Sequence, residues 1–273
     1  MLSLVVVYVG LGALAPLLAL AQHLRPAREG VPSIAVRARS LDWAYWLVTP
    51  LFSGLLSRAL IVALGAMLVV ALGAEVRHAD DVLAFFEARS ILSAIPSWSQ
   101  LLVCLLLVDL LSYWSHRLRH RPLFFPLHAV HHSSRELDWL AAARMHPLDE
   151  IVDNIVISLP ILLLGPAPWV FLVLGPITLL YTLVSHAAVE LPLGPLRFVI
   201  VGPAFHRAHH ALDAPGVNYA GMFSLWDLVF GTFRDPLSIA VPQRFGVEAP
   251  TVEDTLRGHV VTPVRRVLFG DRS

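Results

Sequence analysis

Long apolar runs alternate along the chain with shorter polar segments. The first run covers residues 2–21, and the second extends from Trp43 to Ala74 with interruptions at Pro50 and Arg58. Each run is about as long as a helix that crosses the hydrocarbon core of a bilayer, roughly 20 residues. The first run has no basic leader segment before it, so we expect an uncleaved spanning helix rather than a signal peptide.

A third apolar run opens at Trp98 and ends near Trp114. The acidic segment before it, residues 75–97, predicts a loop that contains at most a short helix. A fourth apolar stretch, residues 151–185, is broken near its middle by a glycine and two prolines between 165 and 168. This pattern predicts a helical hairpin whose two arms are short for full crossings.

The composition places this pattern in a membrane. Hydrophobic residues make up 56% of the 273 positions, charged residues make up 15%, and the mean hydropathy is +0.68. The formal net charge is +0 and like charges form no run, which excludes a nucleic-acid-binding protein. The single cysteine, Cys104, lies in an apolar run and is expected to be a buried free thiol.

Arginines predict the orientation of the helices. Positive residues accumulate on the cytoplasmic side of membrane proteins, so residues 115–150 and 186–273 are expected on that side and the N-terminus on the other. All 20 basic residues are arginine, which we interpret as coding bias in a GC-rich genome and hence a bacterial inner-membrane protein. The arginines that carry the orientation are residues 25, 28, 37 and 39 after the first helix, and 117, 119, 121, 135 and 144 after the third.

The histidines are the candidate functional residues of this chain. The chain has 13, and three motifs repeat a helical spacing. Residues four apart share a face of a helix, as do residues three apart, so each motif presents its imidazoles together. The motifs are an HxxxH pair, His116 and His120, and two HxxHH triplets, His128, His131 and His132, then His206, His209 and His210.

Bound metal explains this density of imidazoles better than a pH-sensing cluster does, because clustered histidines repel one another when they are protonated. One ion accepts about four such ligands, and imidazole suits iron, zinc, copper and nickel. Eight or more ligands therefore argue for two ions.

The motifs HRLRH, HAVHH and HRAHH, in this order and with a helical hairpin between the second and third, resemble the fatty acid hydroxylase and sterol desaturase superfamily. The resemblance covers about residues 101–232. It includes ARMHPLDE at 143–150, LVSHAAVELPLGP at 183–195 and the closing segment NYAGMFSLWDLVFGT at 218–232, which we expect to pack beneath the metal site.

The resemblance implies two further ligands, His146 and His186, and thus ten in all. The residues leave an alternative open for each: His146, before Pro147, could start a helix, and His186 could be a simple interfacial residue. It implies an all-α membrane helical bundle with a cytoplasmic, histidine-rich cap that holds two iron ions. It also implies O2 as co-substrate, a lipid substrate that is hydroxylated or desaturated, and a separate electron donor such as a ferredoxin, cytochrome or reductase. We expect one structural domain divided into N-terminal membrane helices (1–97), a catalytic region (98–235) and a C-terminal tail (236–273).

Several acidic residues could orient these ligands. Asp109 lies inside the third apolar run, where a carboxyl group is a functional candidate, and we expect it to orient a ligand. Asp149, Glu150, Asp153 and Asp227 could hold imidazole N–H groups, or equally be solvated or pair with nearby arginines. Three histidines outside the motifs, His23, His78 and His259, are expected on the surface.

Two other classes of protein compete with an oxygenase. A histidine-rich metal transporter would place its ligands inside the spans, whereas here they follow the helix ends. A membrane zinc hydrolase needs three ligands and a carboxylate base, but the chain contains no HExxH motif.

Overall fold

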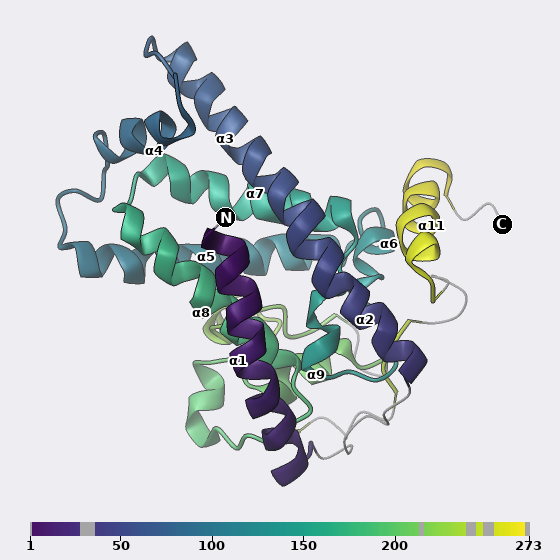
Figure 1. Ribbon diagram of the computed structural model, residues 1–273. Coiled ribbons are helices and arrows are strands. Elements are labelled where there is room, and N and C mark those ends of the chain that lie inside the picture. The colour runs from purple at the N-terminus through teal and green to yellow at the C-terminus, as the bar shows by residue number, and fades with distance from the viewer. Residues whose placement is uncertain (1, 28–35, 213–215, 239–243, 248–253, 271–273) are drawn as a thin grey trace.

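The computed structural model describes residues 2–27, 36–212, 216–238, 244–247 and 254–270, and within these ranges the chain is helical with no strand beyond two isolated bridges (Figure 1). The helices are α1 (Leu2–Leu24), α2 (Val36–Val48), α3 (Gly54–Ala71), α4 (Ala79–Glu87), α5 (Ser97–Arg119), α6 (Phe125–His128), α7 (Pro147–Leu164), α8 (Pro168–His186), α9 (Pro203–His210), α10 (Leu225–Val229) and α11 (Leu256–Phe269). Shorter turns are a π-helical turn at Thr49–Ser53 and 3-10 turns at His131–Ser133, Trp139–Ala143 and Gly194–Phe198.

Four described helical segments are long and apolar enough to cross a membrane: Val7–Leu24, Ser40–Ala71, Ser97–Arg119 and Pro168–His186. The first three confirm the predicted spans. The fourth corrects the expectation that both arms of the hairpin are short. Pro168 occupies the first turn of α8, where a proline starts a helix instead of breaking it, so all 19 residues of this arm are helical.

The second span is one continuous helical segment although it contains Pro50. A proline has no N–H for the helical ladder and clashes with the preceding turn, and here the backbone widens into the π-helical turn Thr49–Ser53 between α2 and α3. Two hydrogen bonds attach this region to the segment before α7: Trp46 Nε1 donates to Leu140 O at 3.0 Å, and Thr49 Oγ1 donates to Ala143 O at 3.0 Å.

One end of the bundle is closed by α4, which is the short helix that the sequence allowed within the acidic segment 75–97. The turn between α7 and α8 packs against it so closely that a Cβ on Gly165 would lie 2.1 Å from Phe86 O, and Gly165 also has a positive φ of 63°. Only glycine tolerates both conditions. Ser90 Oγ donates to Leu164 O at 3.1 Å in the same region.

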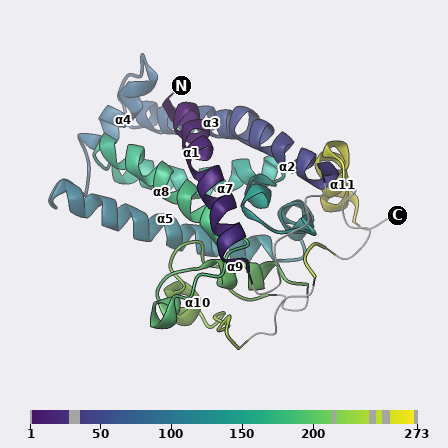
Figure 2. The same ribbon diagram turned by 60° about the horizontal axis from the view of Figure 1, so that its bottom comes forward.

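The histidine motifs gather at the opposite end. The C-terminal ends of α5 and α8, the N-terminal end of α7, and helices α6 and α9 meet there, away from α4 in the views of Figures 1 and 2. The motifs therefore lie on one side of the spans, as predicted, and the all-helical fold with its histidine-rich end is confirmed. Of the arginines used to predict the orientation, Arg28 lies outside the described residues, and the side chains of Arg37 and Arg39 are not described either.

The C-terminal helix α11 corrects one expectation. We predicted His259 on the surface, but it is fully buried, and its Nδ1 lies 2.9 Å from the hydroxyl of Tyr45 in α2. The contact joins residues 214 positions apart, so no local sequence pattern could predict it. His23 and His78 are exposed, as expected.

Candidate metal centre

Helix α5 delivers the first pair of histidines. His116 and His120 stand one turn apart, and their rings lie on the same face with centroids 5.1 Å apart. The His116 Nδ1 lies 2.7 Å from the carbonyl oxygen of Tyr219. Because that oxygen can only accept, Nδ1 carries the proton and Nε2 presents a lone pair.

The two triplets have different backbones. The third motif forms α9 as predicted, with Pro203 at its first turn. The second motif is not one helix: α6 ends at His128, and a 3-10 turn begins at His131. The expected single stripe of three imidazoles is therefore broken between these two residues, and the ring of His131 points to a different group from the rings beside it.

The structure brings nine histidines together in two groups, and within each group the ligand atoms lie within 4.8 Å of one another. Each triplet contributes to both groups, so residues i and i+4 face one centre while residue i+3 faces the other. The larger group contains His116, His120, His128, His132 and His209. The smaller group contains His131, His186, His206 and His210.

His146 is the exception among the ten predicted ligands, because it lies in neither group. Its Nδ1 accepts a hydrogen bond from Leu148 N at 3.1 Å and so caps α7, and its Nε2 lies 3.1 Å from Val260 O in α11. Both ring nitrogens are therefore engaged away from the cluster. The segment resembles the family motif, but here the histidine starts a helix.

The larger group leaves its ring nitrogens without partners. The Nε2 atoms of all five members are buried and have no hydrogen-bond partner among the described residues. A buried polar atom without a partner costs about 1–3 kcal/mol. Five such atoms that face one another are the donor set that a metal ion of the imidazole-binding class requires.

The smaller group supports the same conclusion through distances. The Nε2 atoms of His131 and His186 lie 3.3 Å apart. The Nδ1 atoms of these rings face the carbonyl oxygens of Arg144 at 3.0 Å and Thr182 at 2.8 Å, so both carry protons and both Nε2 atoms present lone pairs. Two lone pairs at this distance repel one another unless a cation lies near them, so the group fits a metal ion.

Burial keeps these imidazoles neutral, which is the form that binds metal. Desolvation lowers the pKa of His120 to about 2 and that of His209 to about 4. Nearby charge acts in the same direction, from His209 and then Arg119 on the pKa of His120, and from Arg119 on that of His209. Burial likewise holds the pKa well below the ordinary value for the other histidines outside the spans: His128, His131, His132, His206 and His210.

Carboxylates support the ligands to different degrees. Asp149 Oδ2 lies 3.0 Å from Nδ1 of His128 and 3.3 Å from Arg119. Burial raises the pKa of Asp149 to about 6, against the lowering effect of Arg119. Asp153 instead accepts from Ser115 Oγ at 2.5 Å and pairs with Arg119 at 3.2 Å. Of the two aspartates, only Asp149 touches an imidazole.

The closing segment holds two ligands through its backbone. Val217 O lies 2.7 Å from His209 Nδ1, and Tyr219 O lies 2.7 Å from His116 Nδ1. Asp227 fixes this loop by accepting from Tyr219 N and Ala220 N, both at 2.8 Å. These contacts confirm that the segment packs against the site, but the carbonyl partners could not be identified from side-chain patterns.

Asp109 acts on the same loop and touches no ligand. It accepts from Met222 N at 2.8 Å, Phe223 N at 2.7 Å and Trp226 Nε1 at 3.0 Å. The expectation that it orients a ligand directly is thus corrected: it holds the segment that carries the orienting carbonyls. Its position in an apolar helix made it a candidate, but its partners lie more than 100 residues away in the chain.

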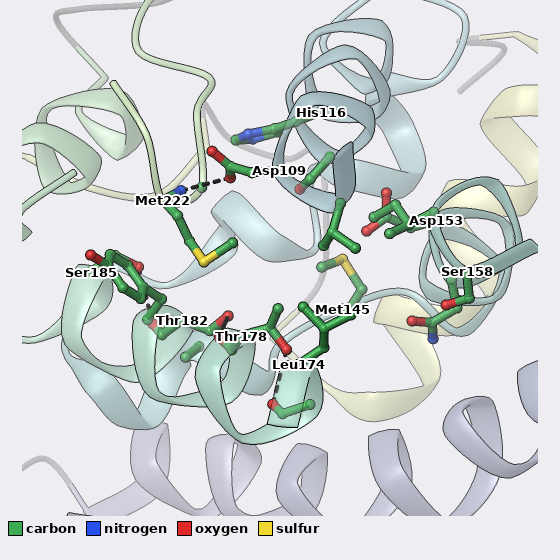
Figure 3. A pocket seen from close by; sticks show the side chains of 18 of the residues that line it. Asp109, His116, Met145, Asp153, Ser158, Leu174, Thr178, Thr182, Ser185 and Met222 are labelled. Carbon is green, nitrogen blue, oxygen red and sulfur yellow. Dashed lines mark hydrogen bonds between the residues drawn. The ribbon is translucent and has the colours of Figure 1, made fainter. Parts of the chain in front are cut away.

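A cavity of about 600 Å³ leads from the histidines into the bundle between α5, α7 and α8. Its far part is apolar, with Ile161, Phe171 and Leu174. Figure 3 shows Thr178 and Thr182 of α8 and Met145 and Met222 directed toward this space near His116. A cavity of this size and lining fits part of an apolar or amphiphilic ligand.

Fold and site together define a class: a helical membrane protein with a buried, histidine-lined metal centre at one end of its spans. Residues 101–232 match the fatty acid hydroxylase family. This fatty acid hydroxylase domain, which covers slightly less than half of the chain, bears out the resemblance of its motifs to the fatty acid hydroxylase and sterol desaturase superfamily.

Several curated proteins are similar in sequence to this chain. The chain is 33% identical over 52% of its length to ornithine lipid hydroxylase OlsE of Rhizobium tropici, and the match covers 44% of that protein. It is 37% identical over 46% of its length to alkylglycerol monooxygenase of Danio rerio, covering 28% of it. It is 31% identical over 54% of its length to methylsterol monooxygenase 1 of Rattus norvegicus, covering 52% of it. The matches thus span about half or less of each relative, and no solved structure matches the chain.

Proposed function

We propose that the protein is a membrane-bound, O2-dependent lipid hydroxylase whose centre holds two iron ions. The observation that carries the proposal is the division of nine histidines, eight buried and His120 half-buried, into two groups whose Nε2 atoms face one another. The proposed ligands are these nine, without His146. Four or five imidazoles per group suit one ion each.

Iron at this position would supply the oxidising power that O2 chemistry on an unactivated C–H bond requires and that amino-acid side chains lack. The protein's own groups prepare the site. Asp149 and the carbonyls of Val217 and Tyr219 hold the imidazole N–H groups, which orients the rings and keeps their Nε2 atoms free. The apolar part of the cavity excludes water and admits an alkyl chain.

The substrate in this proposal is a lipid that enters from the bilayer. Three observations support it: the relatives are named for activities on lipids, four helical segments are suited to a membrane, and two of these, α5 and α8, line the cavity beside the histidines. Hydroxylation is preferred over desaturation because the relatives are named as a hydroxylase and as monooxygenases.

Electrons come, in this proposal, from a separate donor such as a ferredoxin, cytochrome or reductase, since the chain carries no flavin or haem fingerprint and only one cysteine. The arginines after the first and third apolar runs support a cytoplasmic position of the centre in a bacterial inner membrane. The catalytic region is proposed to cover residues 98–235, between the N-terminal helices (1–97) and the tail (236–273).

Two measurements test the function. Metal analysis of protein purified in detergent is expected to give about two irons per chain; a single zinc would point to a hydrolase and refute the proposal. Expression in a bacterial host under isotopically labelled O2 is expected to yield a lipid that carries one labelled oxygen atom. A His209→Ala variant should yield none, whereas His78→Ala, which changes an exposed histidine, should match the unmodified protein.

A further inference from the structure

A second cavity, of about 340 Å³, lies between α1, α3, α7 and α8. It shares part of its wall with the cavity beside the histidines, and the shared residues include Asn154 and Ser158 of α7 and Thr178 and Thr182 of α8. In Figure 3, which shows the first cavity, Thr178 and Thr182 lie on one helix and Ser158 on another across from it. The two cavities therefore meet along a polar strip between α7 and α8.

Arg58 lines both cavities. It is the one charged residue of α3, whose other 17 positions are apolar or small and uncharged. An arginine within an apolar span is costly and marks a functional position unless it merely extends its side chain to the membrane surface. Arg58 is exposed, and no hydrogen bond or ion pair within 4.0 Å joins it to a residue in the described part of the chain.

Glu150, on the first turn of α7, provides the complementary group. It lines the second cavity together with Asn154, and both Asn154 and Ser53 lie beside its carboxyl group. Its Oε2 atom is buried without a hydrogen-bond partner among the described residues. Glu150 and Arg58 are close enough to interact electrostatically, but they form no direct ion pair. Each therefore keeps hydrogen-bonding capacity toward the cavity: Arg58 as a donor and Glu150 as an acceptor.

The remaining walls are suited to a chain of methylene groups. Val7, Ile61 and Leu179 contribute apolar side chains to the second cavity, and beyond the polar strip the first cavity continues to Ile161 and Phe171. An amphiphile could thus place a polar group between α3 and α7 and extend its chain past the histidines.

We propose that the second cavity binds the head group of the lipid substrate, and that this head group carries both an acidic oxygen and an N–H or O–H donor. Arg58 binds the acidic oxygen, Glu150 accepts from the donor, and the chain crosses between α7 and α8 into the cavity beside the metal centre. The inference rests on the proposed function, because it assigns the lipid to the same centre.

The test compares three probes with the same acyl chain: lysophosphatidylethanolamine, which has phosphate and an N–H donor; lysophosphatidylcholine, which has phosphate without that donor; and monoacylglycerol, which has hydroxyls only. Binding to the iron-loaded protein in nanodiscs is measured by competition. The ethanolamine lipid is expected to bind most tightly, and Arg58→Gln should reduce its affinity by about tenfold or more, to the level of monoacylglycerol. Glu150→Gln should abolish the preference for ethanolamine over choline.

Arg89→Gln, which changes an arginine packed on Phe85 beside α4, is the matched control and should leave the ranking unchanged. Arg58→Lys keeps the charge and should retain part of the phosphate preference if Arg58→Gln folds poorly. An unchanged ranking in Arg58→Gln and Glu150→Gln would overturn the inference, as would displacement of the ethanolamine lipid by inorganic phosphate alone. Product analysis separates the two proposals: oxidation with an unaltered ranking refutes only the head-group site, and an altered ranking without oxidation refutes only the hydroxylase.

Discussion

Removing the metal should loosen the histidine-rich end of the protein while the membrane spans persist. In the larger group, five buried Nε2 atoms have no hydrogen-bond partner among the described residues, and the proposed metal ion would be their partner. Each costs about 1–3 kcal/mol when left unsatisfied. Together they rival the roughly 5–15 kcal/mol that stabilises a typical folded protein, so the metal-free arrangement cannot persist at this end.

Hydrogen–deuterium exchange of the protein in nanodiscs, before and after chelation, measures this effect. Residues 116–146 and 203–222 should lose most of their protection on chelation, and iron should restore it. Helix α3 should keep its protection, because its packing against α7 and α4 involves no metal ligand. Equal protection of the histidine segments in both states would refute the argument that bound metal satisfies these nitrogens.

Three further predictions concern single residues. His131→Ala and His209→Ala, one from each group, should each abolish tight metal binding and activity, whereas His78→Ala should change neither. Iron content and product yield are measured for each variant. Equal results for all three variants would contradict the assignment of the ligands. Asp149→Asn should weaken iron affinity about 10–100-fold, because it removes the carboxylate that holds the His128 ring. A chelator titration measures the iron affinity, and an unchanged value would count against this role of Asp149. His259 has a pKa lowered to about 4, chiefly by burial, so the unfolded state binds its proton first as the pH falls below about 6.5. The iron-loaded protein should therefore lose up to about 3 kcal/mol between pH 6.5 and 4, and His259→Gln should lose less over the same range in unfolding measurements; identical pH profiles would refute this.

Periodicity and length alone determined much of this protein. Apolar runs predicted the first three spans, because a helix must be about that long and that apolar to cross a bilayer. The spacing of the histidines predicted that His116 and His120 share a face, which the structure confirms. Their number predicted two ions, which stays a prediction. These features depend only on local geometry and composition, so they can be predicted from the sequence alone.

Tertiary structure decided how the ligands divide and which residues support them. The split of each triplet between two groups follows from the direction in which α6, α9 and the ends of α5 and α8 meet. The contact of His146 with the backbone of Val260, the burial of His259 beside Tyr45, and the hydrogen bonds of Asp109 to the closing segment all join residues far apart in sequence. Such contacts arise only when the helices pack, because a side chain's partner is set by distance in space and leaves no periodic trace along the chain.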